Sequence, residues 1–226
     1  MIVAAHPDDE LLGLGATMHK LIHTQNVTAH VVILGEGITS RADSRDVKAC
    51  DSNLKTHRQN MKNAAEKIGY QSESFYNFAD NRFDSHDLLD IVKVIEKEKN
   101  NFQPNFIFTH HKGDLNIDHQ VTFQAVMTAC RPMDTENVKG IISFETPSAT
   151  EWQANSDPRK FSPNLYMEIC HIDLVAKCEA MEEYEFEKRK FPHPRSSKAL
   201  EILASYRGMT IGKPLAEAFE IIRLIS

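Results

Sequence analysis

A histidine and three consecutive acids lie close together near the start of the chain, in the stretch "AAHPDDELLG" at residues 4–13. His6 and Asp9 are separated by two residues, so one tight turn from a strand into a helix can present an imidazole and a carboxylate to the same point. Pro7 fixes its own φ angle and favours an extended conformation at His6. Zinc binds nitrogen and carboxylate ligands and keeps an open position in catalytic sites. The spacing therefore predicts two ligands of a metal ion.

A third ligand has to come from elsewhere in the chain, and the stretch "THHKGDLNIDH" at residues 109–119 is the richest source. It contains three histidines and two aspartates within eleven residues. His119 is the candidate ligand, although His110 and His111 compete with it. Asp118, beside His119, either orients a ligand or one of its neighbours as a hydrogen-bonded carboxylate, or caps the helix that begins there.

Asp8 lies next to the first pair of candidate ligands and need not bind the metal itself. A zinc ion lowers the pKa of a bound water to about 7, so a neighbouring carboxylate can take the proton as general base. Glu10 is expected only to stabilise the start of the helix through the helix dipole. The alternative for the whole stretch is that its acids cap the helix while His6 packs at the strand end. The second cluster at residues 109–119 favours the metal site.

Strand and helix patterns alternate through the first two thirds of the chain. Strands are expected at residues 1–5, 27–34, 74–78, 104–110 and 138–146, and helices at 10–25, 57–70, 88–100 and 118–130. This alternation predicts an α/β, Rossmann-like three-layer fold with a mostly parallel central sheet and helices on both faces. In the last third, strands are expected at 164–169 and 218–225 and helices at 172–187 and 197–208.

Four polar loops follow four of the expected strands. Ligands of such sheets bind outside the carboxyl ends of the strands, so these loops are expected to converge along one edge. The loops are "HPDDE", "GEGITSR", "ADNRFD" and "HHKGDLNIDH". Histidine, aspartate and arginine side chains from distant parts of the chain should therefore meet at one place.

Composition and charge restrict the remaining possibilities. The chain has 226 residues, 41% of them hydrophobic, which fits a single domain over 1–226. Its net charge of −6 argues against a nucleic-acid partner. The four cysteines form no CxxC pair, which is typical of reduced thiols in a cytoplasmic protein. No apolar run approaches the roughly 20 residues that a membrane span requires, and no signal peptide is visible. Met1 already falls inside the first expected strand, which is consistent with a natural start a residue or two earlier.

Two long stretches resemble one family. "AAHPDDELLGLGATM" and, about a hundred residues later, "HHKGDLNIDHQVTFQAV" resemble the PIG-L (LmbE-like) zinc-dependent de-N-acetylases. "GEGITSR", "DNRFD", "FPHPRS" and "YRGMTIGKPLAEAFEIIR" are similar to stretches of bacterial members that act on sugar derivatives. The resemblance implies that His6, Asp9 and His119 bind zinc and that Asp8 is the catalytic base.

One position departs from the family pattern. Many members have a histidine three residues before the third ligand, where it is thought to stabilise the tetrahedral intermediate, and this chain has Asn116 there. Asparagine can donate a hydrogen bond to an oxyanion but cannot carry a charge or pass on a proton. The general acid is then His193, which is held between two prolines, or His111. The alternative for His193 is a proline-bracketed surface turn.

Further residues are candidates for binding the substrate. Arg41 lies on the loop after the second expected strand, where the resemblance implies an arginine that holds the sugar or its phosphate; the alternative is an ordinary solvated or ion-paired arginine. His111 is a second candidate, whereas Arg82 is expected to be an ordinary solvated or ion-paired arginine. Trp152 either stacks on a sugar face or packs on the body of the protein.

The resemblance and the residues together predict an enzyme. The expected reaction is hydrolysis of the N-acetyl group of an amino sugar of N-acetylglucosamine type, or of its conjugate, to acetate and a free amine. The expected cofactor is Zn²⁺, and Fe²⁺ or Co²⁺ suits the same ligands. A zinc amidase acting on another acyl amide or a sugar–thiol conjugate is one alternative. The other is a non-catalytic Rossmann-type ligand-binding module, although Gly13 and Gly15 form only part of a dinucleotide motif. The expected partner is a small acetylated sugar, and self-association is left open.

Overall fold

A seven-stranded sheet forms the centre of the computed structural model, which describes residues 1–41, 43, 45–134 and 136–225. The strand order is β3-β2-β1-β4-β5-β7-β6. The first five strands in chain order pair in parallel, and β7 pairs antiparallel with both β5 and β6. The strands are β1 (Ile2–Ala4), β2 (His30–Gly35), β3 (Ser72–Phe78), β4 (Phe106–His110), β5 (Gly140–Phe144), β6 (Leu165–Glu168) and β7 (Ala216–Leu224).

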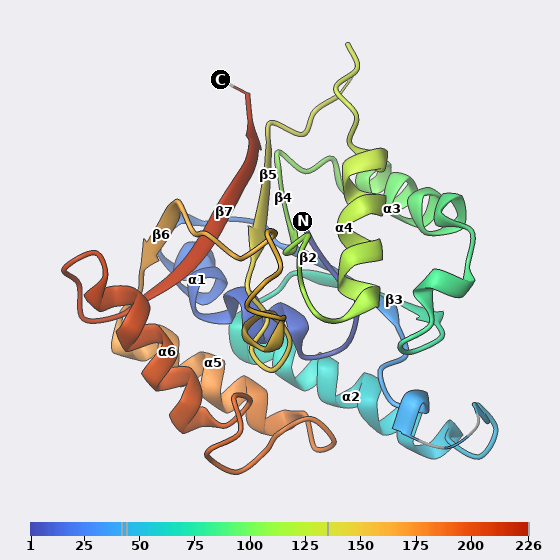
Figure 1. The fold of residues 1–226 in the computed structure, drawn as a ribbon, viewed down its shortest axis with the longest axis horizontal. Coiled ribbons are helices and arrows are strands. Elements are labelled where there is room, and N and C mark those ends of the chain that lie inside the picture. Colours follow the sequence, from blue (N-terminus) through green and yellow to red (C-terminus); the bar gives the residue numbers. More distant parts are fainter. Residues whose placement is uncertain (42, 44, 135, 226) are drawn as a thin grey trace.

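In the part of the chain that the structure describes, six helices cover the two faces of this sheet. They are α1 (Asp9–Gln25), α2 (Asp51–Ile68), α3 (Leu88–Phe102), α4 (Ile117–Ala129), α5 (His171–Glu183) and α6 (Ser197–Met209). In Figure 1, α3 and α4 lie on one side, and α1, α2, α5 and α6 lie on the other. The expected three-layer α/β fold with a mostly parallel sheet is confirmed. None of the helices in the described ranges is long and apolar enough to cross a membrane.

The central strands supply two separate cores because successive side chains of a strand point to opposite faces. Ile2 and Ala4 belong to the core under α1, α2 and α5. Val3 and Ala5 belong to the core under α3 and α4. Every residue of β1 and β2 is buried. This double burial explains why these strands are almost continuously apolar in the sequence.

The element boundaries differ from the expected ones mainly at two helices. The second helix begins at Asp51, six residues before the expected start at position 57, and Gly69 closes it in a left-handed conformation with φ of 95°. The helix α5 ends at Glu183, four residues before the expected end at 187. Tyr184 leaves the helix and directs its hydroxyl to Glu10, 2.6 Å away. This tertiary contact is absent from the local helical pattern.

The strand order reverses direction at β1, which has β2 on one side and β4 on the other. Ligand sites of such sheets lie at this switch point, outside the carboxyl ends of the strands. Here the backbone N–H of Ala5 donates to His110 Nε2 at 2.9 Å, which joins the ends of the two strands. A Cβ atom at Gly13 would lie 2.2 Å from the Phe144 ring. Gly13 is therefore required for close packing of α1, which explains the partial GxG pattern without a dinucleotide.

A buried ion pair fixes the shape of α1. This helix is kinked at Leu14, and the Glu217 carboxylate accepts a hydrogen bond from the backbone N–H of Thr17 at 2.6 Å just after the kink. Lys177 donates to Glu217 Oε1 at 2.5 Å and to the Leu12 carbonyl at 2.9 Å. The lysine and the glutamate are about one-twentieth exposed. The pair therefore holds α1 between α5 and β7.

Removing one partner of this pair should destabilise the fold strongly. Lys177→Met leaves the Glu217 charge buried and unpaired, so we expect a loss of about 3 to 5 kcal/mol in the free energy of unfolding. Lys198→Met is the matched control, because Lys198 pairs with Glu201 on the exposed surface. That change should cost less than about 1 kcal/mol. Urea unfolding curves measure both values, and equal losses would contradict the role of the buried pair.

Candidate metal centre and active site

His6 and Asp9 come from the turn that joins β1 to α1. His6 follows β1 and Asp9 is the first residue of α1. The backbone N–H of His6 donates to Asp9 Oδ2 at 2.8 Å, and Nδ1 of the His6 ring lies 3.4 Å from the same oxygen. The turn thus brings the imidazole and the carboxylate to one point.

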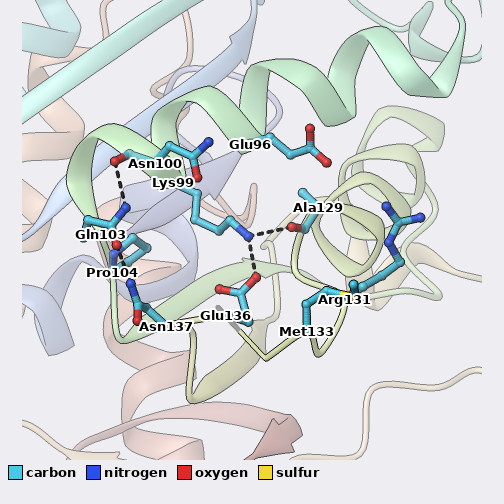
Figure 2. Close-up of a pocket in the computed structure, with 10 residues that line it drawn as sticks. All are labelled: Glu96, Lys99, Asn100, Gln103, Pro104, Ala129, Arg131, Met133, Glu136 and Asn137. Carbon is cyan, nitrogen blue, oxygen red and sulfur yellow. Dashed lines mark hydrogen bonds and ion pairs between the residues drawn. The ribbon is translucent and has the colours of Figure 1, made fainter.

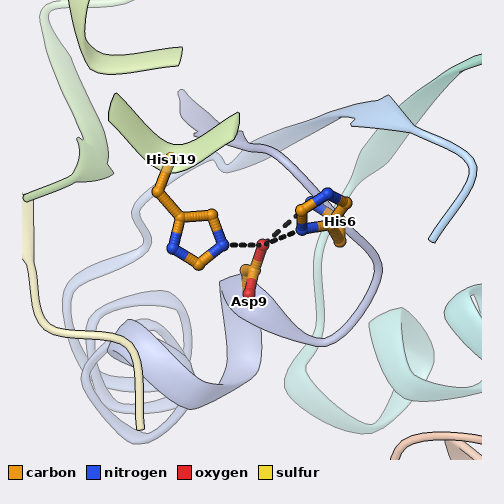
Figure 3. A group of neighbouring side chains, drawn as sticks. All are labelled: His6, Asp9 and His119. Atoms are coloured by element: carbon orange, nitrogen blue, oxygen red, sulfur yellow. Dashed lines mark hydrogen bonds and ion pairs between the residues drawn. The ribbon is translucent and has the colours of Figure 1, made fainter. Parts of the chain in front are cut away.

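His119 reaches the same point from the first turn of α4. Its Nε2 lies 3.3 Å from Asp9 Oδ2, and one ligand atom from each of His6, Asp9 and His119 lies within 4.8 Å of the other two. Figure 3 shows the two imidazole rings on either side of the Asp9 carboxylate. The structure therefore brings together the three residues that the sequence suggests as metal ligands.

The charges around His119 suit a cation site. Both ring nitrogens of His119 are buried without an aligned hydrogen bond, although Asp9 and Asp114 lie at 3.3 and 3.1 Å. Burial lowers the pKa of His119, but these two carboxylates outweigh it and raise the pKa to about 9. The site thus holds an excess of negative charge and an orphaned imidazole. Two imidazoles and a carboxylate are a donor set that zinc and related divalent metals accept.

Two further carboxylates orient the imidazoles. Asp118 Oδ2 lies 2.8 Å from His6 Nε2, and Asp118 also accepts the backbone N–H groups of Asn81 and Phe83 at 2.7 and 2.9 Å. Asp118 therefore contacts His6, whereas Asp114 contacts His119. The alternative in which Asp118 caps α4 is wrong, because Asn116 is the N-cap.

A second group of His6, Asp80 and Asp118 could also hold a cation by distance. His6 Nε2 lies 3.3 Å from Asp80 Oδ1 and 2.8 Å from Asp118 Oδ2. However, Asp118 already accepts hydrogen bonds from two backbone N–H groups, so its contact with His6 suits the support of a ligand. We therefore assign the ion to the first group.

His110 is the competitor of His119, and its ring nitrogens are engaged elsewhere. Nε2 accepts the Ala5 N–H, and Nδ1 lies 3.1 Å from Thr146 Oγ1. Its ring stacks on the His119 ring with centroids 3.8 Å apart. Burial and the neighbouring His119 lower the pKa of His110 well below its usual value. His110 thus packs behind His119 as a neutral imidazole.

Asp8 has a strained backbone, with φ of 101° and ψ of −25°. Such conformations are costly for residues other than glycine and occur where the surroundings fix them. Glu10 Oε2 accepts the backbone N–H of Asp8 at 3.0 Å, and Glu10 Oε1 accepts the Tyr184 hydroxyl. Burial raises the pKa of Glu10 to about 7. Glu10 is therefore buried and supports the backbone of Asp8. The sequence predicts only a role at the start of the helix.

Arg195 faces the Asp8 side chain and is the main residue that sequence reasoning missed. Its guanidinium Nη1 lies 3.1 Å from Asp8 Oδ2 and 2.6 Å from Glu187 Oε2. Burial raises the pKa of Asp8 well above its usual value, and the charge of Arg195 opposes this shift. The Oδ2 atom is buried without an aligned hydrogen bond. Arg195 stands in the stretch "FPHPRS", but periodicity cannot place that segment beside Asp8.

These groups line a cavity of about 250 Å³ at the carboxyl ends of the strands. Its lining includes His6, Asp8, Ser40, Arg41, Asn81, Asn116, Trp152, Glu187, Arg189, His193 and Arg195. A second cavity of equal size lies between the ends of α3 and α4, before β4 and β5 (Figure 2). There Lys99 is held by Glu136 and by the Ala129 carbonyl, and no histidine lines the walls. His6, Asp8 and Asp80 thus give the first cavity its link to the titratable cluster.

Three candidate residues from the sequence do line this cavity. Arg41 is 41% exposed at its side chain and forms an ion pair with Glu187. Asn116 is half-buried, and its Oδ1 accepts the Asp118 N–H at 2.8 Å, which leaves the amide N–H₂ group as a donor. His193 is partly buried, and burial and the nearby Arg195 lower its pKa. All three side chains can therefore reach a ligand in the cavity, as their predicted roles require.

The substrate-binding or acid role predicted for His111 does not fit the structure. His111 is 1% exposed and does not line the cavity. Its Nδ1 lies 3.1 Å from Glu220 Oε2, and its Nε2 lies 2.7 Å from the Arg159 carbonyl oxygen. His111 therefore links a loop to β7. Arg82 is exposed, and no carboxylate of the described ranges forms an ion pair with it.

The chain is similar to a known protein family and to a bacterial protein described as a deacetylase. Residues 1–130 match the PIG-L family model, described as GlcNAc-PI de-N-acetylase. The uncharacterized deacetylase YaiS of Escherichia coli (strain K12) is 26% identical over 191 residues, which are 82% of this chain and 89% of YaiS.

Two solved structures share the fold at low sequence identity. The N,N'-diacetylchitobiose deacetylase from Pyrococcus horikoshii is similar with a TM-score of 0.76 and 16% identity, over 98% of this chain and 82% of that one. The 4-carboxy-2-hydroxymuconate hydratase GalB from Pseudomonas putida KT2440 has a TM-score of 0.71 and 19% identity, over 98% and 94%. The family model covers more than half of this chain and includes His6, Asp8, Asp9 and His119. The chain therefore belongs to the PIG-L family of de-N-acetylases.

Proposed function

We propose that this chain is a metal-dependent N-deacetylase that hydrolyses the N-acetyl group of an amino sugar of N-acetylglucosamine type, or of its conjugate, to acetate and a free amine. The observation that carries the proposal is the convergence of His6, Asp9 and His119 at a polar cavity that His6 and Asp8 line. Membership of the family and the relative YaiS support it. GalB has the same fold and a different activity, so the fold alone does not decide the reaction.

The residues divide the chemistry between them. His6, Asp9 and His119 would hold a divalent metal, which polarises the amide carbonyl as a Lewis acid. Asp8 takes the proton of the attacking water as general base. Asn116 donates a hydrogen bond to the developing oxyanion through its free amide N–H₂ group. The leaving amine receives its proton from Asp8 or from His193, which line the same cavity.

Arg195 has a supporting part in this scheme. Without a counter-charge, the buried Asp8 carboxyl would favour its neutral form and could not accept a proton. The guanidinium, 3.1 Å from Asp8 Oδ2, opposes this effect and favours the charged carboxylate. Arg195 thus shifts Asp8 toward the form that can accept a proton, while burial holds the pKa of Asp8 above its usual value.

Several finer features remain part of the proposal. We propose Zn²⁺ as the metal, with Fe²⁺ or Co²⁺ as alternatives that the same ligands accept. The single-domain organisation, the cytoplasmic location and the lack of a nucleic-acid partner stay predictions, and self-association stays open. A zinc amidase for another acyl amide or a sugar–thiol conjugate would use the same residues. A ligand-binding module would need neither the metal nor Asp8.

A substrate screen tests the proposed activity. Acetate release is measured with free, nucleotide-linked and lipid-linked N-acetyl sugars as substrates. We expect release from at least one of them, loss of release after chelation and recovery on addition of zinc. A fully metal-loaded protein that releases no acetate from any of these compounds would contradict the proposal.

The ligand set predicts how substitutions change metal binding. His119→Ala removes one ligand, so the purified protein should lose its stoichiometric metal by elemental analysis. Asp118→Asn weakens the support of His6 and should lower metal affinity about 10- to 100-fold in a chelator competition. Asp84→Asn changes an exposed acid of the neighbouring loop and should leave affinity unchanged. Full occupancy in His119→Ala would refute the ligand assignment.

Asp8→Asn separates proton transfer from metal binding. The substitution keeps the shape of the side chain but removes the base, so acetate release should fall by at least about 100-fold. Metal content should stay at the wild-type value, because Asp8 is not a ligand in this scheme. Turnover at the wild-type rate would show that another group takes the proton.

A further inference from the structure

Trp152 occupies an unusual place for a tryptophan. It is the only tryptophan of the chain, it is 52% exposed, and it lines the cavity that contains Asp8. Tryptophan is on average a highly buried residue. Its indole meets the His193 ring edge to face, with centroids 5.7 Å apart and an angle of 84° between the planes. A large flat apolar surface is thus presented inside an otherwise polar cavity.

The segment that carries Trp152 is tied to the metal-ligand cluster. Thr150 Oγ1 donates to Asp114 Oδ2 at 2.6 Å, while Asp114 Oδ1 faces His119 at 3.1 Å. Trp152 ends the same short helical turn, Thr150–Trp152. The turn that carries the indole is therefore tied to the metal-ligand cluster through one carboxylate. A fixed aromatic face beside a catalytic site is suited to stack on a flat ligand.

Arg189 lines the same cavity from the segment at residues 188–195, "KRKFPHPR". This segment has four cationic residues and no acid, although the whole chain has a net charge of −6. Arg189 Nη1 donates to the carbonyls of Phe186 and Lys188 at 2.7 and 2.9 Å. Across the described ranges, no carboxylate forms an ion pair with it. Arg41 and Arg195, in contrast, both pair with Glu187.

We propose that Trp152 and Arg189 together select the substrate: the indole stacks on the sugar ring, and the guanidinium binds an anionic group that the sugar carries. This inference rests on the proposed deacetylase function and names the class of its substrate, an anionic N-acetylhexosamine derivative. The cavity of about 250 Å³ lies below the roughly 300 to 1,000 Å³ of pockets for larger ligands. It therefore accommodates one ring, and any larger group extends outside it.

Each of the two side chains suits the part of the substrate that it is proposed to bind. A sugar ring presents an apolar C–H face that an indole can cover. The planar guanidinium presents two parallel N–H donors to a phosphate or a carboxylate. Because Arg189 is exposed to solvent, its contribution should be modest and should fall as the salt concentration rises.

Tryptophan fluorescence tests the stacking directly, because Trp152 is the only tryptophan. The metal-loaded full chain is titrated with glucosamine, glucosamine 1-phosphate and muramic acid, which have no N-acetyl group to lose. We expect each ligand to change the emission, and the phosphate and carboxylate derivatives to bind about fivefold more tightly than glucosamine. No emission change with any of the three would overturn the stacking. Equal affinities would overturn the anion site.

Variants separate the two contacts. Arg189→Gln should abolish the advantage of the charged ligands, whereas Arg82→Gln, an exposed arginine outside the cavity, should preserve it. Trp152→Leu should weaken binding of glucosamine by about tenfold in calorimetry, and Trp152→Phe should restore most of it. Equal binding by these two tryptophan variants, or an undiminished advantage in Arg189→Gln, would overturn the corresponding contact.

These experiments distinguish a wrong binding proposal from a wrong proposed reaction. Metal content should equal that of the wild type in every variant, since neither residue is a proposed ligand. If the ligands bind as described and no N-acetyl sugar releases acetate, only the proposed reaction is wrong. If acetate is released from uncharged and charged N-acetyl sugars with equal kcat/KM and Arg189→Gln changes neither, only the anion site is wrong.

Discussion

The rest of the site depends on the contacts that the Asp9 carboxylate makes. One of its oxygens accepts the backbone N–H of His6 and lies 3.3 to 3.4 Å from nitrogens of the His6, His110 and His119 rings. Burial alone would raise the pKa of Asp9, but the neighbouring imidazoles outweigh it and keep this pKa well below its usual value. A single ionised oxygen therefore joins the end of β1, the start of α1, the end of β4 and the first turn of α4.

The Arg195 guanidinium contacts two cavity residues that have strained backbones. Asp8 and Ser148 both have positive φ angles, of 101° and 74°. Arg195 faces the Asp8 carboxylate and donates to Ser148 Oγ at 2.7 Å. Tyr184 and Arg195, which support Asp8, lie beyond the stretch that matches the family model. The candidate metal ligands thus lie within the stretch that matches the family model, whereas part of the cavity wall, including Ser148, Trp152 and Arg195, lies beyond it.

Local patterns were sufficient for the central strands and for the first two ligands. The strand and helix alternation depends on side-chain periodicity, and the His6–Asp9 pair lies within one turn, so neither needs knowledge of tertiary contacts. His111 shows where such reasoning fails. It follows His110 directly, and successive residues at a strand end point to opposite sides, so only one of the two could face His119. Both histidines are buried, and the contact of His111 with Glu220 of β7, which no local pattern shows, is what directs it away from the site. Arg195 was missed for a related reason, because an ion pair between distant loops leaves no periodic signal.

Asn116 connects the departure from the family pattern to the geometry of the ligands. Its side chain accepts the Asp118 N–H, and its own N–H donates to Asp114 Oδ1 at 2.9 Å. The residue therefore fixes the backbone or side chain of both carboxylates that orient the imidazoles. Asparagine is among the most favourable residues at a helix N-cap. A histidine at this position would add a titratable group but would not cap the helix equally well. The chain thus gains a rigid support for its ligands, and the positive charge that lines the cavity comes from Arg41, Arg189 and Arg195.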